Sequence, residues 1–118
     1  MALDEMDREI RAGTLTIRTH RNDSSYTIAL AGELDLANGD DLSAELERVG
    51  SDGSAEMIIL DMAELEFIDS TGIAILVAAH RRLNADGDRF QLACSKATEV
   101  CRVLALTGLD AAIPFLEQ

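Results

Sequence analysis

The sequence of 118 residues is 47% hydrophobic and has a formal net charge of −12, with its acidic residues spread along the chain. This length predicts a single domain with one core, and the hydrophobic content excludes a disordered chain. The negative charge repels phosphate backbones and anionic lipids, so we expect no binding to nucleic acid and none to a membrane.

Two cysteines, Cys94 and Cys101, occur without a CxxC pair or a cluster of histidines around them. This arrangement predicts two free thiols in a reducing compartment, and it also permits a disulfide. The acidic N-terminus lacks the basic and apolar segments of a signal peptide, and no apolar run approaches the ~20 residues of a membrane-spanning helix. We therefore expect a cytoplasmic protein.

The first part of the chain predicts a β-hairpin. Residues 1–13 are polar and are expected to form a lead-in before the folded domain. β-Branched residues alternate over 14–19 (TLTIRT) and 26–31 (YTIALA), which is typical of strands, and the polar residues 22–25 between them predict a turn. Two antiparallel strands should result.

A helix is predicted over residues 38–49. Asn38 is expected to be its N-cap, and the acidic residues that follow suit the positive end of the helix dipole. Apolar residues recur at helical spacing, so one face of the helix should contact the core. Glu45 is expected on the opposite, solvent-facing side.

A buried strand and a second helix follow. The apolar run over 57–60 (MIIL) is typical of a strand that is buried on both faces, and a polar loop is expected over 61–66. A helix is then predicted from about residue 70 to residue 84. Five residues at helical spacing should form its inward stripe: Ile73, Leu76, Val77, His80 and Leu83.

The last third predicts a strand over 90–93, a third helix with Ser95 as N-cap, and a left-handed end to that helix at Gly108. Residues 113–116 are apolar and should add an edge strand, the only place that suits Pro114. Taken together, the order of elements predicts the α/β class. We expect a mixed, mostly parallel sheet of about five strands with helices packed on it.

No motif of an active site or cofactor site is present. The sequence lacks a glycine-rich phosphate-binding loop and the GxSxG nucleophile motif. His80 lies ten residues after Ser70 on one predicted helix, about 15 Å of rise, which is too far for it to act as the base for that hydroxyl. We therefore expect a protein that is not an enzyme and has no cofactor or metal.

The segment Asp69-Ser70-Thr71-Gly72 joins a strand-like run to the second helix. One interpretation is that Asp69 or Ser70 only caps the helix. The other is that Ser70 is also phosphorylated, which would add about −1.5 to −2 charges at the positive end of the helix and act on a partner interface rather than on folding. Residue chemistry alone leaves both interpretations open.

The outward face of the second helix is a candidate docking surface. It is expected to carry Thr71, Ile75, Ala78 and Arg82 opposite the inward stripe. Ile75 is a large apolar side chain close to the junction, which is consistent with a surface that binds a partner.

Short motifs in a fixed order carry a resemblance to a known family. These are GELD (residues 32–35), an apolar strand that ends near Asp61, FIDSTG (67–72) and LTGL (106–109). Together they resemble a STAS domain and, more narrowly, the bacterial anti-sigma-factor antagonists. The resemblance covers residues 14–116, which we expect to be the domain.

The resemblance implies a binding module that sequesters an anti-sigma factor and so releases a sigma factor. The anti-sigma factor is also a serine kinase, which phosphorylates the first hydroxyl after the Asp of the motif, here Ser70. The phosphorylated form is released, and a metal-dependent serine phosphatase resets it.

The resemblance also implies roles for other residues near Ser70. Asp69 and Gly72 shape its loop, and Thr71 fills the second hydroxyl position. Glu33 and Asp35 belong to a neighbouring loop that in the family also faces the kinase. Ile75 and Arg82 are added as partner-binding candidates from the helical pattern alone.

Two segments depart from the pattern of the family. Residues 86–88 (DGD) are more acidic than the usual small turn, and residues 93–96 (ACSK) replace a loop that is commonly polar or contains proline. These departures bear on the identity of the partner more than on the family. Two other functions stay open. One is a scaffold or regulatory STAS subunit of a stress-sensing assembly or a transporter, and the other is an enzyme with Ser70 as nucleophile.

Overall fold

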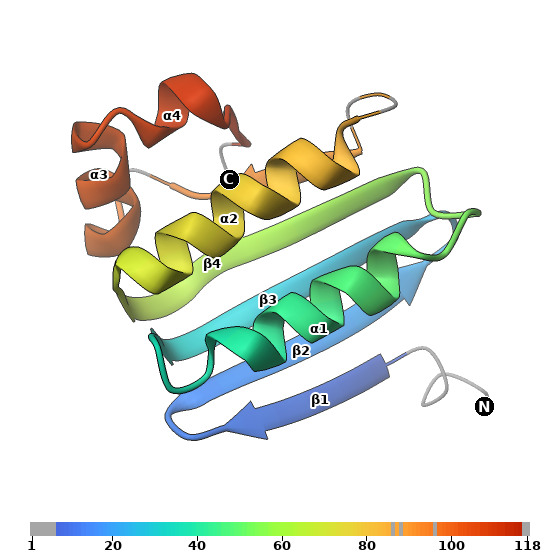
Figure 1. Cartoon of the computed structure of the whole chain (residues 1–118), viewed down its shortest axis with the longest axis horizontal. Helices are drawn as coiled ribbons and strands as arrows, with labels where there is room; N and C mark the ends of the chain where they lie inside the picture. Colours follow the sequence, from blue (N-terminus) through green and yellow to red (C-terminus); the bar gives the residue numbers. More distant parts are fainter. Residues whose placement is uncertain (1–6, 86, 88, 96, 117–118) are drawn as a thin grey trace.

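The strands of the sheet lie side by side in the same order as in the chain (Figure 1). The structure is a computed structural model that describes residues 7–116 except 86, 88 and 96. The strands are β1 (Asp7–Ala12), β2 (Leu15–Asn22), β3 (Ser25–Leu34), β4 (Met57–Ile68), β5 (Phe90–Ala93) and β6 (Phe115–Leu116). The helices are α1 (Gly39–Gly50), α2 (Ser70–Leu83), α3 (Glu99–Leu106) and α4 (Leu109–Ala112).

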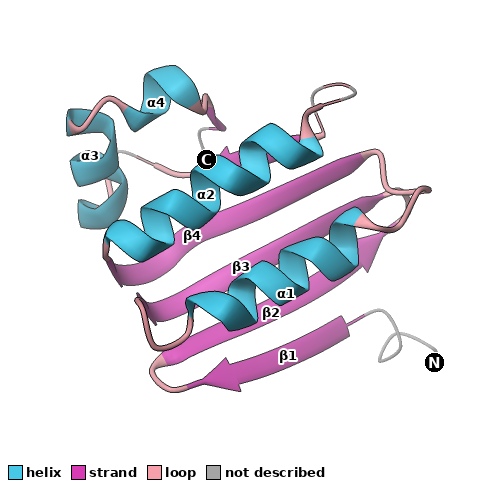
Figure 2. Ribbon diagram, viewed as in Figure 1, coloured by secondary structure: helices cyan, strands magenta, loops and turns pink. Residues whose placement is uncertain are grey.

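The sheet is mixed, as predicted. β1, β2 and β3 pair antiparallel, whereas the pairs β3–β4, β4–β5 and β5–β6 are parallel. α1 connects β3 to β4 and α2 connects β4 to β5, and both helices cover the same face (Figure 2). Successive right-handed crossovers that advance in one direction along a sheet place their helices on one face.

The core lies between this face and the helices. Alternate residues of the central strands are buried there, and they form one cluster with the buried residues of the helices. The opposite face, called the open face below, carries half-buried or exposed side chains of β2 to β5. It presents Thr16, Arg18, His20, Thr27, Ala29, Ala31, Ile59, Asp61, Ala63 and Gln91.

Two expectations about the strands were wrong. Residues 7–12, assigned to a polar lead-in, form β1, because the exposed edge of a sheet accepts polar residues and Glu9 pairs across it with Arg18 at 2.8 Å. Residues 1–6 of that lead-in lie outside the described residues. The polar loop expected over 61–66 is the second half of β4, which β5 does not flank, so polar side chains there face solvent.

Glu45 was expected on the solvent side of α1 but is buried, with 2% of its surface exposed. Its carboxylate accepts hydrogen bonds from Arg48 at 2.8 and 2.9 Å, from the Thr19 hydroxyl, and from Arg8 at 3.2 Å. Burial by itself raises the pKa of Glu45, but these bonds outweigh it and hold the pKa below its usual value. The helical pattern could not reveal partners that come from β1 and β2.

The two cysteines were expected to be free, but Cys94 and Cys101 form a disulfide. Cys94 follows β5 directly and Cys101 lies in α3, with their Cα atoms 5.5 Å apart. The bond fixes α3 to the end of β5. The sequence separation of seven residues alone does not indicate that the two side chains meet.

The third helix begins later than predicted. Thr98, not Ser95, is the N-cap of α3, and its hydroxyl accepts a hydrogen bond from the Cys101 amide. Gly108 follows this helix with φ of 87°, the left-handed conformation that was predicted. β6 is an edge strand, also as predicted, and α4 is an additional short helix.

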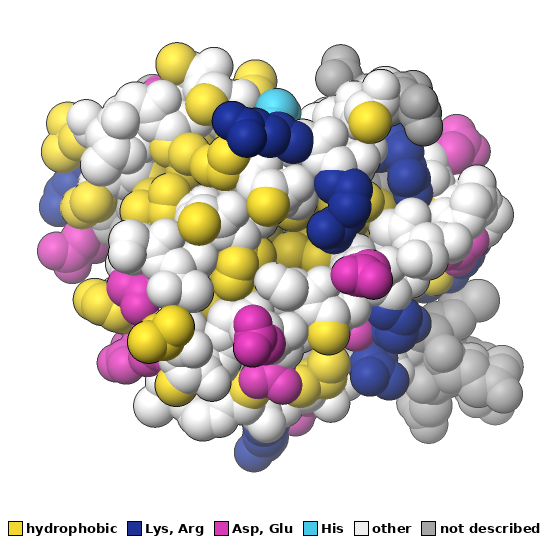
Figure 3. Space-filling model, in the orientation of Figure 1, with side chains coloured by type: hydrophobic (Ala, Val, Ile, Leu, Met, Phe, Trp, Pro, Cys, Tyr) yellow, Lys and Arg dark blue, Asp and Glu magenta, His cyan; other side chains and the backbone are white. Residues whose placement is uncertain are grey.

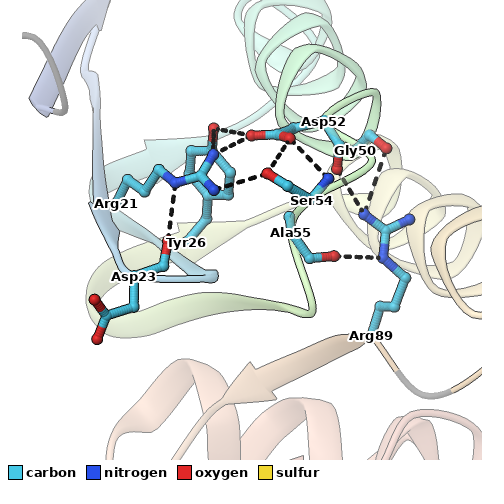
Figure 4. Close-up of polar contacts among 8 residues, drawn as sticks. All are labelled: Arg21, Asp23, Tyr26, Gly50, Asp52, Ser54, Ala55 and Arg89. Carbon is cyan, nitrogen blue, oxygen red and sulfur yellow. Dashed lines mark hydrogen bonds and ion pairs between the residues drawn. The ribbon is translucent and has the colours of Figure 1, made fainter.

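A polar network closes the end of the sheet where β4 and β5 begin (Figure 4). Asp52 accepts hydrogen bonds from the Ser54 hydroxyl at 2.7 Å, the Ser54 amide at 2.9 Å and the Tyr26 hydroxyl at 2.8 Å, and it pairs with Arg21. Arg89 reaches backbone carbonyls of the same loop at 3.2 to 3.5 Å. The hydrogen bonds from Ser54 have the largest effect on the pKa of Asp52. Together with the bonds from Tyr26 and Arg21, they hold this pKa far below its usual value.

Candidate functional site

The junction between β4 and α2 lies at the other end of the sheet, where the parallel strands end. Asp69 has an extended backbone and caps α2, because its Oδ1 accepts a 3.0 Å hydrogen bond from the Gly72 amide. Ser70 is the first residue of the helix and is not the cap. The capping interpretation is therefore confirmed for Asp69.

The second oxygen of the same carboxylate reaches another loop. Asp69 Oδ2 accepts a 3.1 Å hydrogen bond from the Leu36 amide, in the loop between β3 and α1. The Asp69 amide in turn donates to the Leu34 carbonyl at 3.2 Å. One residue thus connects the two loops that follow neighbouring parallel strands.

The loop between β3 and α1 is organised by Asn38, of which 2% is exposed. Its Oδ1 accepts a hydrogen bond from the Asp35 amide at 2.9 Å, and its Nδ2 donates to the Glu33 carbonyl at 2.9 Å. Asn38 occupies the N-cap position of α1 as predicted, but its side chain makes no cap bond. It fixes the backbone of Glu33 and Asp35 instead.

Two glycines allow the helices to approach this end closely. A Cβ atom on Gly72 would lie 2.6 Å from Ile68 Cγ1 and 2.9 Å from Leu34 Cγ. A Cβ atom on Gly39 would lie 2.8 Å from Ile75 Cδ1. Gly72 therefore needs to be glycine for packing, because it meets the inner atoms of two packed side chains, whereas a methyl group at Gly39 would require only the end of the Ile75 side chain to shift.

The Ser70 side chain is exposed, and its hydroxyl makes no hydrogen bond to any part of the chain that the structure describes. Two large apolar side chains are exposed in the adjoining segments: that of Leu36, whose amide bonds to Asp69, is 78% exposed, and that of Phe67, three residues before Ser70, is 48% exposed. Glu33 pairs with Phe67 across β3 and β4. The hydroxyl is thus accessible at the edge of a surface that is both apolar and acidic.

Further exposed apolar side chains lie on α3, where Leu106 is 81% and Val103 is 47% exposed. α3 packs against β4 and lies close to the start of α2 in Figure 1. Figure 3 shows hydrophobic side chains gathered on the same side of the molecule, whereas Lys and Arg side chains gather toward the other end of α2. This end of the sheet therefore offers more apolar surface than the junction alone.

The outward face predicted for α2 is only partly outward. Thr71 and Ile75 are half-buried in a groove between α1 and α2 that Asp40, Ala78 and Arg82 also line. Arg82 is exposed but lies twelve residues after Ser70, about 18 Å along the helix. The structure thus brings Asp69, Ser70, Thr71, Gly72, Glu33 and Asp35 together at one end. It does not place Arg82 there.

Sequence reasoning missed Leu36, Phe67 and the internal role of Asn38. An isolated leucine in a polar loop was the available signal for Leu36, and the end of an alternating strand was the signal for Phe67.

In the described ranges, no group of three His, Cys, Asp or Glu side chains could hold a metal ion. Nor does any described helix have the length and apolar character needed to cross a membrane.

A family model described as "Mlab, STAS domain" matches residues 17–117. The chain belongs to the STAS domain family. This confirms the family that the GELD, FIDSTG and LTGL motifs indicated. The sheet is mixed as predicted, but it contains the additional strand β1 and a longer β4 than expected.

Curated relatives of this STAS domain include two anti-sigma-factor antagonists. An "Anti-sigma F factor antagonist" of Paenibacillus polymyxa is 24% identical over 103 residues, which cover 87% of this chain and 87% of the relative. An "Anti-sigma-B factor antagonist" of Staphylococcus aureus is 27% identical over 95 residues, which cover 80% of this chain and 86% of the relative.

Solved structures agree with the fold of this STAS domain. The crystal structure of an anti-sigma factor antagonist from Mycobacterium paratuberculosis has a TM-score of 0.75 and 24% identity, and the match covers 90% of this chain and 89% of that one. The Bacillus cell fate determinant SpoIIAA in its phosphorylated form has a TM-score of 0.65 and 23% identity, covering 86% and 90%. At these identities the likeness concerns the fold.

Proposed function

We propose that this STAS domain is an anti-sigma-factor antagonist that is switched by phosphorylation of Ser70. The unphosphorylated form binds an anti-sigma factor that is also a serine kinase. The kinase transfers the γ-phosphoryl group of ATP to the Ser70 hydroxyl, which leaves ADP and phosphoserine, and the modified protein dissociates. A metal-dependent serine phosphatase hydrolyses the phosphoserine and restores binding.

The observation that carries this proposal is the position of Ser70. Its exposed hydroxyl begins α2, directly after the capping residue Asp69, and the adjoining segments carry the exposed side chains of Leu36 and Phe67. A kinase can therefore reach the hydroxyl without unfolding the helix, and a partner that covers the two apolar side chains also covers the hydroxyl. The names of the relatives support the same function.

The electrostatics of this position favour a switch that acts on binding. A phosphate on Ser70 would lie at the positive end of α2, a contact worth about 0.3–2 kcal/mol, while Asp69 repels it. The fold should therefore tolerate the modification. A doubly negative group that a partner must bury without a counter-charge costs several kcal/mol, and ~1.4 kcal/mol already weakens binding tenfold.

The test uses four forms of the protein as baits: the wild type, Ser70→Ala, Ser70→Glu and Ser51→Glu. Ser51 is an exposed serine just after α1, so Ser51→Glu adds the same charge far from the junction. A kinase captured by the wild type is purified, and its affinity for each form is measured by calorimetry. Incubation with ATP followed by mass spectrometry locates the phosphate.

We expect a serine-kinase-like ATPase that binds the wild type, Ser70→Ala and Ser51→Glu alike, and binds Ser70→Glu at least about tenfold more weakly. The phosphate should be found on Ser70. Equal binding of all four forms, or a phosphate at another residue, would reject the switch. A large assembly held equally by all forms would favour the scaffold alternative.

A further inference from the structure

The open face of the sheet has no helix packed on it, and its charges are divided between its two sides. Its centre is a hollow of about 130 Å³ lined by small residues of β2, β3 and β4, including Thr16, Ala29, Ala31 and Ala63. Arg18 of β2 borders the hollow on one side. The other side is bordered by carboxylates of β4.

The strand register places the opposite charges on either side of one alanine. Arg18 pairs with Ala29 across β2 and β3, and Ala29 pairs with Asp61 across β3 and β4. Ala29 therefore lies midway between a guanidinium and a carboxylate. Arg18, Ala29 and Asp61 thus form a row across the three strands, called the central row below. The alanine leaves the middle of this row without a long side chain.

These charges have unused bonding capacity. Arg18 contacts Glu9 only through Nε, at 2.8 Å, so its two terminal nitrogens have no partner among the described residues. Asp61 is half-buried and accepts one hydrogen bond, from the Ala63 amide at 3.0 Å, and no cation in the described ranges pairs with it. Glu64, beside it on β4, likewise has no cationic partner there.

From this arrangement we propose that the open face binds a second copy of the same chain, with a two-fold axis that lies between the two sheets, runs parallel to β3 and passes over Ala29. The axis places Arg18 of each copy over Asp61 of the other, because the two residues lie on opposite sides of Ala29 in one row. An interface of this symmetry must be complementary to itself, and the opposite charges satisfy that condition. The small residues let the two sheets approach to about 10 Å.

The neighbouring rows fit the same axis. His20 lies in a row with Thr27 and Ile59 on one side of the central row, and Ala31 pairs with Glu64 on the other side. The rotation keeps each row opposite itself and reverses the order of the strands, so that His20 meets Ile59 and Thr16 meets Glu64 of the second copy. No pair of like charges is brought together by the operation.

The size of the face sets the expected strength. The four strands β2 to β5 at about 4.8 Å and about six residues at about 3.4 Å give a surface of roughly 20 Å by 20 Å, which is small for a stable interface. The dimer should therefore be weak and should appear over the micromolar to millimolar range. It leaves the junction at Ser70 uncovered, since the interface is centred on Ala29 in the middle of β3, whereas Ser70 follows the end of β4.

Charge reversal tests the proposal. Sedimentation equilibrium of the purified chain, with no partner protein, measures self-association of the wild type, Arg18→Glu, Asp61→Arg and the variant that carries both changes. Each single change sets two like charges against each other in both halves of the interface, so the dissociation constant should rise at least about tenfold. The double change restores opposite charges and should restore the wild-type constant.

Two controls complete the test. Arg102→Glu makes the same charge change on α3, away from the open face, and should leave association unchanged. Ala29→Glu places a carboxylate on the two-fold axis against its own copy and should also abolish association. It serves as the second variant if a single reversal does not fold, which circular dichroism establishes first.

A wild type that stays monomeric up to millimolar concentration overturns the proposal. So does a dimer that none of the open-face changes weakens, or one that the double reversal fails to restore. Because no kinase enters the measurement, failure here is distinct from failure of the Ser70 switch.

Discussion

The carboxylate of Asp69 and the backbone amide of Leu36, 33 residues apart in sequence, are joined by a 3.1 Å hydrogen bond. The other carboxylate oxygen caps α2 through the Gly72 amide. One side chain therefore sets the position of the segment that carries the Ser70 hydroxyl relative to the segment that carries an exposed leucine. A partner that contacts both would bind a surface that is already formed.

Replacing Asp69 should separate these two roles. In Asp69→Ala both acceptors are lost, and the free energy of unfolding should fall by about 1–2 kcal/mol because a helix cap is removed. In Asp69→Asn the carbonyl oxygen still caps α2, but the amide nitrogen cannot accept a bond from Leu36. Urea unfolding should therefore show a smaller loss of unfolding free energy for Asp69→Asn than for Asp69→Ala. Faster hydrogen exchange at the Leu36 amide in Asp69→Asn would identify the lost bond as the cause.

An exposed acid away from the junction provides the control for that series. Glu56→Ala should change the free energy of unfolding by less than about 0.5 kcal/mol. If Asp69→Ala were as stable as this control, the side chain would have no capping role.

A methyl group at Gly72 should destabilise the protein. Alanine in place of glycine normally favours a helix by about 1 kcal/mol, but here its Cβ would lie 2.6 Å from Ile68 and 2.9 Å from Leu34. Overpacking of this kind costs about 1–3 kcal/mol, so Gly72→Ala should have a lower melting temperature than the wild type. Gly53→Ala is the matched control, because no atom lies within 4 Å of its added Cβ. A gain in stability for Gly72→Ala would contradict the packing described here.

The disulfide between Cys94 and Cys101 should contribute measurably to stability. For a loop of this length, chain entropy predicts about 2–3 kcal/mol. Reduction, or replacement of both cysteines by alanine, should therefore lower the midpoint of denaturant unfolding. Mass spectrometry after alkylation without reductant should find no labelled thiol, and labelling of both cysteines in the native protein would contradict the bond.

Acid should weaken the network around Asp52. Its pKa is depressed in the folded protein by the hydrogen bonds from Ser54, Tyr26 and Arg21, so below its unfolded value of about 3.9 the unfolded chain binds the proton more readily. This contribution is complete above that pH and is lost as the pH falls further. Asp52→Asn should consequently flatten the decline of the unfolding free energy below about pH 4.

Asp23→Asn is the control for the acid measurement. In Figure 4 Asp23 accepts a hydrogen bond from Arg21 through its backbone carbonyl and none through its side chain, and its φ of 56° is one that asparagine adopts readily. Its stability should decline with acid as steeply as that of the wild type. An equal slope for Asp52→Asn would show that the network does not respond to acid.

Periodicity predicted the elements whose burial depends on their own residues. The strand over 90–93 and the helices near 38–49 and 70–84 have the expected bounds to within about one residue, because an apolar stripe is visible in a local segment. β1 was missed because its polar residues are stabilised by pairing with β2, which a local pattern does not record. Glu45 was placed wrongly for the same reason.

In the candidate site too, features set by neighbouring residues were predictable, and features that depend on contacts between distant segments were not. The Asp69 cap was predictable, since an acid directly before an apolar helix is a local signal. Its bond to Leu36 was not, because that contact depends on β3 and β4 being parallel neighbours. The exposure of Phe67 likewise follows from where β5 ends and not from the residues around it.

The agreement between strand order and chain order has a consequence for how the protein is made. Each strand pairs with the strand synthesised just before it, so no segment must wait for a distant partner to leave the ribosome. The hairpin of β1 and β2 can form first, and every later strand then finds an edge already in place. The disulfide, whose second cysteine lies in α3, can close only after most of that sheet exists.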